Sequence, residues 1–329
     1  MVMMPDHNCK STGFGSFRID MKKKLAEYCR SLDIGYVGIA PAEPYHDFGK
    51  TWRRQVEKGY ISGFEERDTA KRVYPELTLE DARSVIVCLF PYYTKTDDHP
   101  ETGDDPGTDG RANIAKYARS IDYHIIIMEK LERIAMFLED NIDGFRWKAF
   151  ADSGPFSDRY LAWKAGLGFR GINGHIITDK YGSYVFIGYI LNNFPFEADD
   201  PQDRTCLQCL ECVRKCPGQC IMGDFTINPK RCKSYITQKK GGLSPEDIQI
   251  LKKHDLIWGC DVCQDVCPHN RNVHSTPMKE FREDLLYSVD IDGLKRISNR
   301  EFRKKYGNRS FSWRGKEILI RNHEIIHGR

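Results

Sequence analysis

Four cysteines closed by a proline constrain this chain more than any other feature of its sequence. Cys206, Cys209, Cys212 and Cys216 fall within eleven positions, and Pro217 follows them. Neighbouring cysteines at such short spacing rarely bring their Cα and Cβ atoms into disulfide geometry. The spacing is that of a metal site, and a segment organised by metal ligands needs little apolar core of its own.

The order C-x2-C-x2-C-x3-C-P is that of bacterial ferredoxins, in which three close thiolates hold one cluster and the fourth thiolate binds a second cluster. A second run follows, with Cys260, Cys263 and Cys267 before Pro268 and with Cys232 as a detached ligand. Eight thiolates are enough for two 4Fe-4S clusters. The crosswise assignment of two-cluster ferredoxins gives one cluster Cys206, Cys209, Cys212 and Cys267, and the other Cys216, Cys232, Cys260 and Cys263.

Zinc is the alternative occupant of these cysteines. Zinc ribbons pair C-x2-C units about 15 to 20 residues apart, and they need neither a third close cysteine nor a Cys-Pro closure. The spacing therefore predicts iron–sulfur clusters. Cys220 lies just after the first run and is not needed as a ligand, so we expect it to be a bystander thiol.

Length and composition limit the class of protein. The chain has 329 residues, of which 40% are hydrophobic, and this is enough for about two domains with a sizeable core. No apolar run approaches the roughly 18 residues of a membrane span. The start, MVMMPDHNCK, lacks the pattern of a secretory signal. Because cluster-bearing thiols need a reducing compartment, we expect a cytoplasmic protein that does not enter the membrane.

Charge is unevenly distributed along the chain. Residues 97–109 are acidic and rich in Gly and Pro, which predicts a solvated loop. Between Lys295 and Arg321, ten basic side chains face two acidic ones, a local net charge of +8. This excess fits a phosphate backbone, with Phe311 and Trp313 positioned to stack on bases. A solvated helical face is the alternative interpretation.

Hydrophobic periodicity predicts a mixed α and β order. Apolar spacing indicates a helix near residues 25–32, a strand at 35–40, a buried strand at 85–90 and a long helix after Asp122. Two further strand-like segments, HIIT and YVFIGYIL, flank a bend at Gly182. We predict an α+β domain over 1–195, a cluster domain over 196–275 and a basic helical tail over 276–329.

Several segments outside the cysteine runs resemble the epoxyqueuosine reductases. They are AKYARSIDYH at 115–124, ADSGPFSDRYLAWKAGLGFRGINGHIIT at 151–178, RCKSYIT at 231–237 and GCDVCQDVCPHN at 259–270. The likeness extends from about residue 20 to residue 325. It implies a nitroreductase-like, cobalamin-binding N-terminal domain followed by a ferredoxin-like module with two 4Fe-4S clusters. It also implies removal of the epoxide oxygen from epoxyqueuosine at the wobble position of tRNA.

The resemblance assigns roles to individual residues. It makes Asp152 the proton donor to the leaving oxygen, which requires a pKa raised by burial and by few hydrogen bonds to the carboxylate. Read without the resemblance, Asp152 or Ser153 is an ordinary helix cap, and His124 is a helix-start or core histidine. The residues that the resemblance places around cobalamin and substrate are Tyr117, Arg119, Asp122, Tyr123, His124 and Ser153.

The chain departs from the family pattern around the substrate pocket. Residues 169–173 read FRGIN, without the usual tryptophan and lysine, residues 59–65 read GYISGFE, and the C-terminal helical repeats of longer members are not expected. These changes favour a second hypothesis, a corrinoid-dependent reductase of another substrate, similar to reductive dehalogenases. A third hypothesis is a two-cluster electron-transfer protein without cobalamin. The resemblance further implies a monomer and a low-potential electron donor of the flavodoxin or ferredoxin type.

Overall fold

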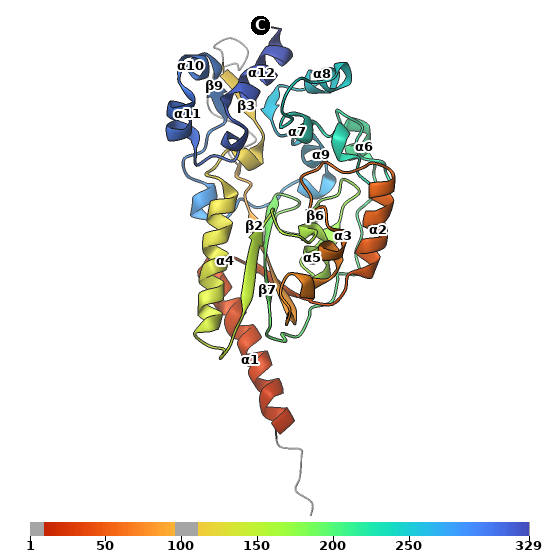
Figure 1. Cartoon of the computed structure of the whole chain (residues 1–329), viewed down its shortest axis with the longest axis vertical. Helices are drawn as coiled ribbons and strands as arrows, with labels where there is room; N and C mark the ends of the chain where they lie inside the picture. Colours follow the sequence, from red (N-terminus) through yellow and green to blue (C-terminus); the bar gives the residue numbers. More distant parts are fainter. Residues whose placement is uncertain (1–9, 96–110, 329) are drawn as a thin grey trace, which may run out of the picture.

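A four-stranded antiparallel sheet lies at the centre of the lower half of the molecule (Figure 1). The computed structural model describes residues 10–95 and 111–328, so the predicted acidic loop at 97–109 and the first residues considered for a secretory signal lie outside it. The strand order is β1-β2-β7-β4. These strands are β1 (Tyr36–Pro41), β2 (Ser84–Pro91), β4 (Trp147–Ala151) and β7 (Val185–Asn192).

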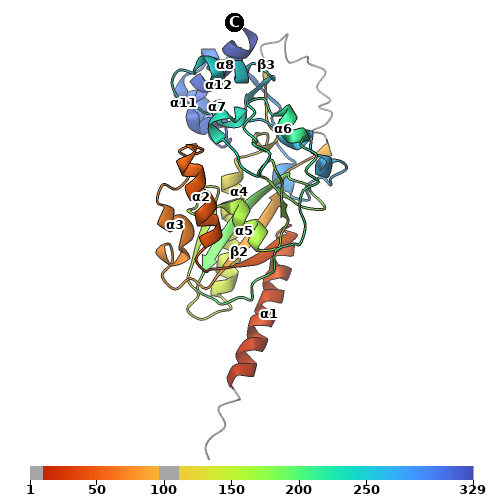
Figure 2. The same ribbon diagram turned by 90° about the vertical axis from the view of Figure 1, so that its right-hand side faces the viewer.

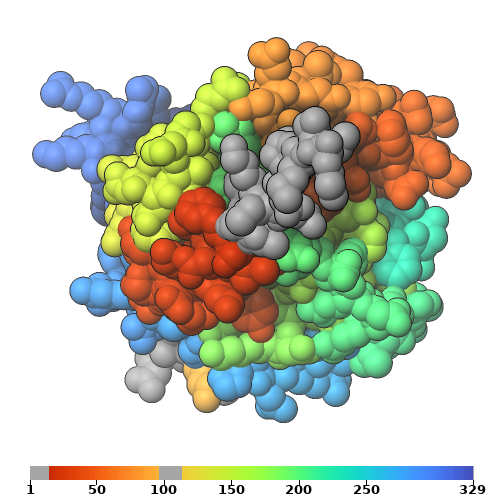
Figure 3. Space-filling model, turned by 90° about the horizontal axis from the view of Figure 1, so that it is seen from below, coloured from red at the N-terminus to blue at the C-terminus, as the bar shows by residue number. Residues whose placement is uncertain are grey.

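Helices cover both faces of this sheet. In β2, Ile86, Cys88 and Phe90 pack towards α1 (Lys10–Ser31) and α4 (Tyr123–Glu139), which lie side by side when the molecule is seen from below (Figure 3). The alternate β2 residues pack towards α5 (Asp158–Lys164), with α2 (His46–Glu57) and α3 (Thr69–Val73) beyond it. Because β2 is buried on both faces, its sequence is apolar without alternation. The predicted long helix is confirmed as α4.

A second sheet joins segments that are far apart in the sequence. Its order is β8-β3-β9, with β3 parallel to β8 and antiparallel to β9. These strands are β3 (Arg111–Ile114), β8 (Leu256–Trp258) and β9 (Ser288–Asp290). Residues 111–114 therefore pair with the C-terminal half of the chain and not with the sheet of the predicted first domain.

The predicted basic tail packs on this second sheet. It contains α10 (Ile291–Arg296), α11 (Asn299–Tyr306) and α12 (Lys316–His327). Phe311 is fully buried in their common core with Trp258 and Phe302, so the prediction that Phe311 stacks on bases is wrong. Trp313, only two positions further on, is 55% exposed. The difference arises because the turn after α11 points the Phe311 ring into the core and the Trp313 ring into solvent.

The cysteine-rich segment lies above the four-stranded sheet and has few apolar contacts (Figure 2). Its helices are α6 (Glu211–Lys215), α7 (Lys233–Ile236), α8 (Pro245–Leu251) and α9 (Val262–Asp265), and the short strands β5 (Phe169–Arg170) and β6 (Ile176–Ile177) precede it in the chain. Short 3-10 turns lie at Pro75–Leu77, Lys116–Ala118, Pro229–Arg231, Pro268–Asn270, Lys279–Phe281 and Ser312–Arg314. Cysteines make up much of two small clusters of buried apolar side chains around the cysteine-rich segment, as expected where metal ligation replaces burial. No helix among the described residues is both long and apolar enough to span a membrane.

Candidate functional site

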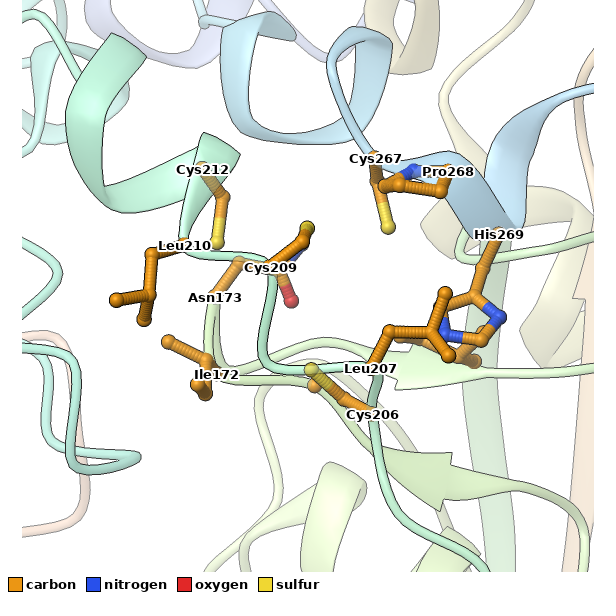
Figure 4. A pocket seen from close by; sticks show the side chains of 12 residues that line it. Ile172, Asn173, Cys206, Leu207, Cys209, Leu210, Cys212, Cys267, Pro268 and His269 are labelled. Carbon is orange, nitrogen blue, oxygen red and sulfur yellow. The ribbon is translucent and has the colours of Figure 1, made fainter.

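One predicted cluster set lines a single cavity. Cys206, Cys209, Cys212 and Cys267, here called the first thiol group, turn their sulfurs into the same space (Figure 4). Cys206 and Cys209 come from the loop entering α6, Cys212 lies in its first turn, and Cys267 follows α9. Apolar side chains complete the wall, namely Ile172, Ile177, Leu207 and Leu210. Because Cys209 is exposed and Cys267 is buried, the cavity reaches the surface on the Cys209 side.

The backbone around the first thiol group suits thiolates. Gln208 and Leu210 have φ of 51° and 60°, a left-handed conformation that is uncommon outside glycine and that curls the loop around the cavity. The backbone N–H of Gln208 donates to Cys206 Sγ at 3.3 Å. Burial raises the pKa of Cys267, and hydrogen bonds from the backbone N–H groups of His269 and Asn270 partly offset that rise. Donors aimed at sulfur stabilise anionic ligands, so the residues fit a 4Fe-4S cluster.

The remaining predicted ligands form a second thiol group, Cys216, Cys232, Cys260 and Cys263. Burial raises the pKa of Cys263, and the charges that raise it further are those of the other three members. For Cys212, burial and the charges of the other members of the first group raise the pKa to about 11. A zinc ion needs ligands that converge on one point. Among the described residues, no three His, Cys, Asp or Glu side chains do so, whereas a cluster binds each thiolate through a different iron.

Cys220 is not an isolated thiol. Its Sγ lies 3.4 Å from Cys216 Sγ, and its backbone N–H donates to the same sulfur at 3.4 Å. Hydrogen bonding from Cys220 lowers the pKa of Cys216 to about 6 and that of Cys232 to about 7. The expectation that Cys220 is not a cluster ligand stays a prediction, and the structure adds that Cys220 contacts two members of the second thiol group.

Asp152 projects from a strained turn at the end of β4. Its φ is 60°, and the backbone N–H of Ser153 donates to the carbonyl of Ala151 at 2.7 Å, which closes the turn. The Asp152 side chain remains 65% exposed. α5 begins at Asp158 and has Ser157 as its N-cap. Neither Asp152 nor Ser153 caps a helix, so that alternative is wrong.

Two side chains at the start of α4 meet the Asp152 carboxylate, and a third holds one of them in place. Tyr123 Oη donates to Asp152 Oδ2 at 2.9 Å, and His124 Nε2 lies 3.6 Å from the same oxygen. Asp122 caps α4, and its Oδ1 is 2.7 Å from His124 Nδ1. Tyr123 is held flat against Phe186, with ring centres 4.2 Å apart. His124 does sit at a helix start, as the alternative proposed, and its ring still reaches Asp152.

These contacts set the protonation states of the site. Burial acts to raise the pKa of Asp152, but hydrogen bonds from His124 and Tyr123 outweigh it, so the pKa of Asp152 is lowered. The prediction of a raised pKa with few hydrogen bonds is therefore wrong. Burial acts to lower the pKa of His124, but Asp122 and Asp152 together raise it to about 9. At neutral pH the proton beside Asp152 resides on His124.

Tyr117 hydrogen-bonds with Ser234, two residues after Cys232 of the second thiol group, and is within electrostatic range of Asp152. Burial raises the pKa of Tyr117, as do the charges of Asp152 and Cys232, while a hydrogen bond with Ser234 lowers it. The tyrosine is thus a neighbour of both. Arg119 lies elsewhere, with its guanidinium 4.8 Å from the ring centre of Tyr287.

Sequence reasoning missed Asp158. Burial first, and then the charge of Asp152, raise the pKa of Asp158 to about 8, so its carboxyl holds a proton at neutral pH. The signal was present in the quoted segment DSGPFSD, which contains two aspartates. Two neighbouring carboxyl groups with divergent pKa values are a recurrent arrangement in acid–base sites.

Two family models match the chain. The model described as epoxyqueuosine reductase QueG, DUF1730, matches residues 72–153, and the 4Fe-4S double cluster binding domain matches residues 205–270. The second match confirms the predicted two-cluster module, and it covers both thiol groups.

Relatives cover nearly the whole chain. The epoxyqueuosine reductase of Staphylococcus aureus is 35% identical over 94% of this chain and 80% of that protein. The structure of the Streptococcus thermophilus enzyme superimposes with a TM-score of 0.84 at 32% identity, over 93% of this chain and 80% of that chain. A second structure, of an epoxyqueuosine reductase with an epoxyqueuosine-modified tRNA-Tyr stem loop, has a TM-score of 0.83 at 34% identity, covering 94% of this chain and 82% of that chain. This chain belongs to the epoxyqueuosine reductase family.

Proposed function

We propose that this chain reduces epoxyqueuosine to queuosine at the wobble position of tRNA, using two 4Fe-4S clusters and cobalamin. Membership of the family supports this, as does the related structure that holds an epoxyqueuosine-modified stem loop. The observation that carries the proposal is the position of Tyr117, a neighbour of both Asp152 and Cys232. A source of single electrons and an acid site are thereby adjacent, as a reductive removal of oxygen requires.

The first thiol group is proposed to hold one cluster and the second thiol group the other. The first group reaches the surface at Cys209, beside Leu207, which is 66% exposed. The second group neighbours Tyr117. Electrons would therefore enter at the first cluster and leave from the second. Leu207 offers an apolar contact for a low-potential electron donor of the flavodoxin or ferredoxin type. We propose that this donor meets the chain as a monomer in the cytoplasm.

The turn that carries Asp152 has groups suited to a corrinoid. Asp152, Ser153 and Arg159 are all exposed there. Their carboxylate, hydroxyl and guanidinium groups can bond the amide side chains of a corrin ring, so the donor set fits cobalamin. When bound, cobalamin supplies a low-valent cobalt centre that accepts electrons singly and reacts with carbon. A Bacillus subtilis relative has been solved with its catalytic aspartate loop swung out of the active site, with a TM-score of 0.82 at 33% identity.

Removing the epoxide oxygen as water consumes two electrons and two protons. His124 holds one proton on Nε2, 3.6 Å from Asp152, and Asp122 fixes the ring in that orientation. Asp152 transfers this proton from His124 to the leaving oxygen. Asp158, whose pKa is raised to about 8 by burial, holds a second proton nearby. Each carbon–oxygen bond that breaks can thus be matched by a proton from the chain itself.

The test is an anaerobic assay. Reconstituted protein, cobalamin, a low-potential reductant and tRNA bearing epoxyqueuosine are combined, and mass spectrometry scores the loss of one oxygen atom. Conversion that depends on cobalamin is the expected result. If protein that holds both clusters and corrinoid gives no conversion, the site serves another substrate. If it never binds corrinoid, the chain is an electron-transfer protein.

A further inference from the structure

Three aromatic side chains and one arginine form an exposed surface that the proposed chemistry does not use. Phe64 comes from the loop after α2, Tyr235 from α7, and Trp313 and Arg314 from the turn between α11 and α12. We call these four residues the aromatic platform. Figure 2 shows the upper end of α2 facing the part of the molecule that holds α7 and α11. Phe64 is 50% exposed and Trp313 is 55% exposed.

The geometry of the platform leaves ring faces open. The Phe64 and Trp313 ring centres are 5.8 Å apart at 73°, so the rings meet edge to face and do not cover each other. The Arg314 guanidinium lies 3.7 Å from the Trp313 ring centre and 5.3 Å from that of Phe64. Phe64 also contacts Tyr235, with ring centres 5.3 Å apart. Flat apolar surface beside a cation is suited to stacking on another planar group.

The charged neighbours of the platform favour a polyanion. Four basic side chains of the tail make internal contacts: Lys295 with Glu324, Arg309 with Asp284, Lys316 with the carbonyl of Leu294, and Arg321 with the carbonyl of Lys239. Five others are exposed on α10 and α11, namely Arg296, Arg300, Arg303, Lys304 and Lys305. Arg303 and the platform residues Trp313 and Arg314 line one open hollow of about 570 Å³. Part of the basic run is thus structural, and Arg303 of the exposed part lies next to the open rings.

A short series of contacts leads from the platform towards the acid site. Phe64 contacts Tyr235, and the adjacent Ser234 hydrogen-bonds with Tyr117, which neighbours Asp152. A nucleotide whose base reacts near Asp152 therefore has its sequence neighbours within reach of the platform. A protein partner would not need this combination of open ring faces, a stacked guanidinium and exposed cations on the adjoining helices.

We propose that the aromatic platform stacks on unpaired bases of the anticodon loop beside the modified nucleotide, while the exposed cations of α10 and α11 contact its phosphates. The proposal rests on the proposed function for the identity of the RNA. Stacking is tolerant of base identity because every base has a π-face. The platform would therefore hold the loop open without selecting its sequence, leaving recognition of the modified base to the acid site.

Binding of an unmodified anticodon stem-loop to the reconstituted full chain, followed by fluorescence anisotropy, tests the platform. Trp313→Ala is expected to weaken binding by about tenfold, and Trp313→Phe by much less, because a stacked ring survives. The salt dependence should stay the same in Trp313→Ala, whereas Lys304→Ala should reduce its slope by about one unit. Phe17→Ala on α1, which removes a ring that is 39% exposed at the other end of the molecule, is the control.

A fully paired RNA duplex separates stacking from charge. Its bases are covered, so Trp313→Ala and the parent chain should bind it equally. The proposal is overturned if Trp313→Ala and Phe64→Ala bind the stem-loop as tightly as Phe17→Ala does, in which case the platform meets a protein instead. Because the RNA is unmodified, the outcome does not depend on turnover. If the chain converts epoxyqueuosine but the platform variants bind RNA normally, only the platform proposal fails. If the platform variants lose RNA binding but the chain does not convert epoxyqueuosine, only the proposed reaction fails.

Discussion

Replacing Asp152 by Asn tests the proton route with little structural disturbance. Asn and Asp are the non-glycine residues that most readily adopt a left-handed backbone, so φ of 60° is preserved. The Asn Oδ1 can still accept the hydrogen bond from Tyr123 that is 2.9 Å long in the parent. No cap is lost, because α5 starts from Ser157. We expect the stability to fall by no more than about 1 kcal/mol, because only the interaction of the exposed Asp152 with His124 is lost.

What the substitution removes is the group that carries a proton from His124 to the leaving oxygen. A positioned general acid is worth about 10² to 10⁴ in rate, so single-turnover conversion should slow by that factor. The assay is loss of one oxygen from epoxyqueuosine tRNA by mass spectrometry, with iron, sulfide and cobalamin contents measured on the same sample. Asp33→Asn is the matched control, since Asp33 is also exposed and has φ of 63°. Equal rates in the two variants, at equal cofactor content, would refute the reasoning.

Three further perturbations address the other parts of the site. His124 has a pKa of about 9, above the ordinary 6.5, so its stabilising contribution is complete below about pH 6.5 and is lost as the pH rises through 9; the rate should fall over the same range, and His124→Gln should abolish that limb of the pH profile. Cys220→Ala removes an S–H donor 3.4 Å from Cys216 Sγ. In an EPR-monitored redox titration, the potential of the second cluster should become more negative by on the order of 20 to 40 mV, with the first cluster as internal reference. Equal second-cluster potentials in the variant and the parent would exclude the effect. Leu207→Glu should slow reduction by reduced flavodoxin severalfold and leave reduction by dithionite unchanged, because only a protein donor needs the apolar contact; stopped-flow absorbance measures both, and an unchanged flavodoxin rate would move the docking surface elsewhere.

The parts of the molecule that sequence predicts well are those set by local spacing. The cysteine runs specify ligand chemistry within a few residues of backbone, so the two-cluster module follows from the sequence alone. The apolar run in β2 and the periodic residues of α4 identify buried elements because burial on one or both faces imposes a repeat. In each case the pattern that allows the prediction lies within one short segment of the sequence.

The parts that escaped prediction depend on contacts between distant segments. Asp152 has a lowered pKa because Tyr123 and His124 approach it from another element, and no pattern around residue 152 reports that approach. Phe311 and Trp313 are equally apolar in the sequence, yet one is buried and the other exposed. The net charge of the tail likewise counts side chains that the fold uses internally.

The lowered pKa of Asp152 is compatible with proton donation once electron transfer is considered. In the resting site, the negative Asp152 and the positive His124 stabilise each other, and the proton stays on the imidazole. An electron that reaches the second cluster adds negative charge near Tyr117, which neighbours both Cys232 and Asp152. Added negative charge raises the pKa of a nearby carboxyl and favours the neutral acid. The same charge also raises the pKa of His124, so reduction would keep the proton on the pair until the leaving oxygen takes it from Asp152 as the carbon–oxygen bond breaks.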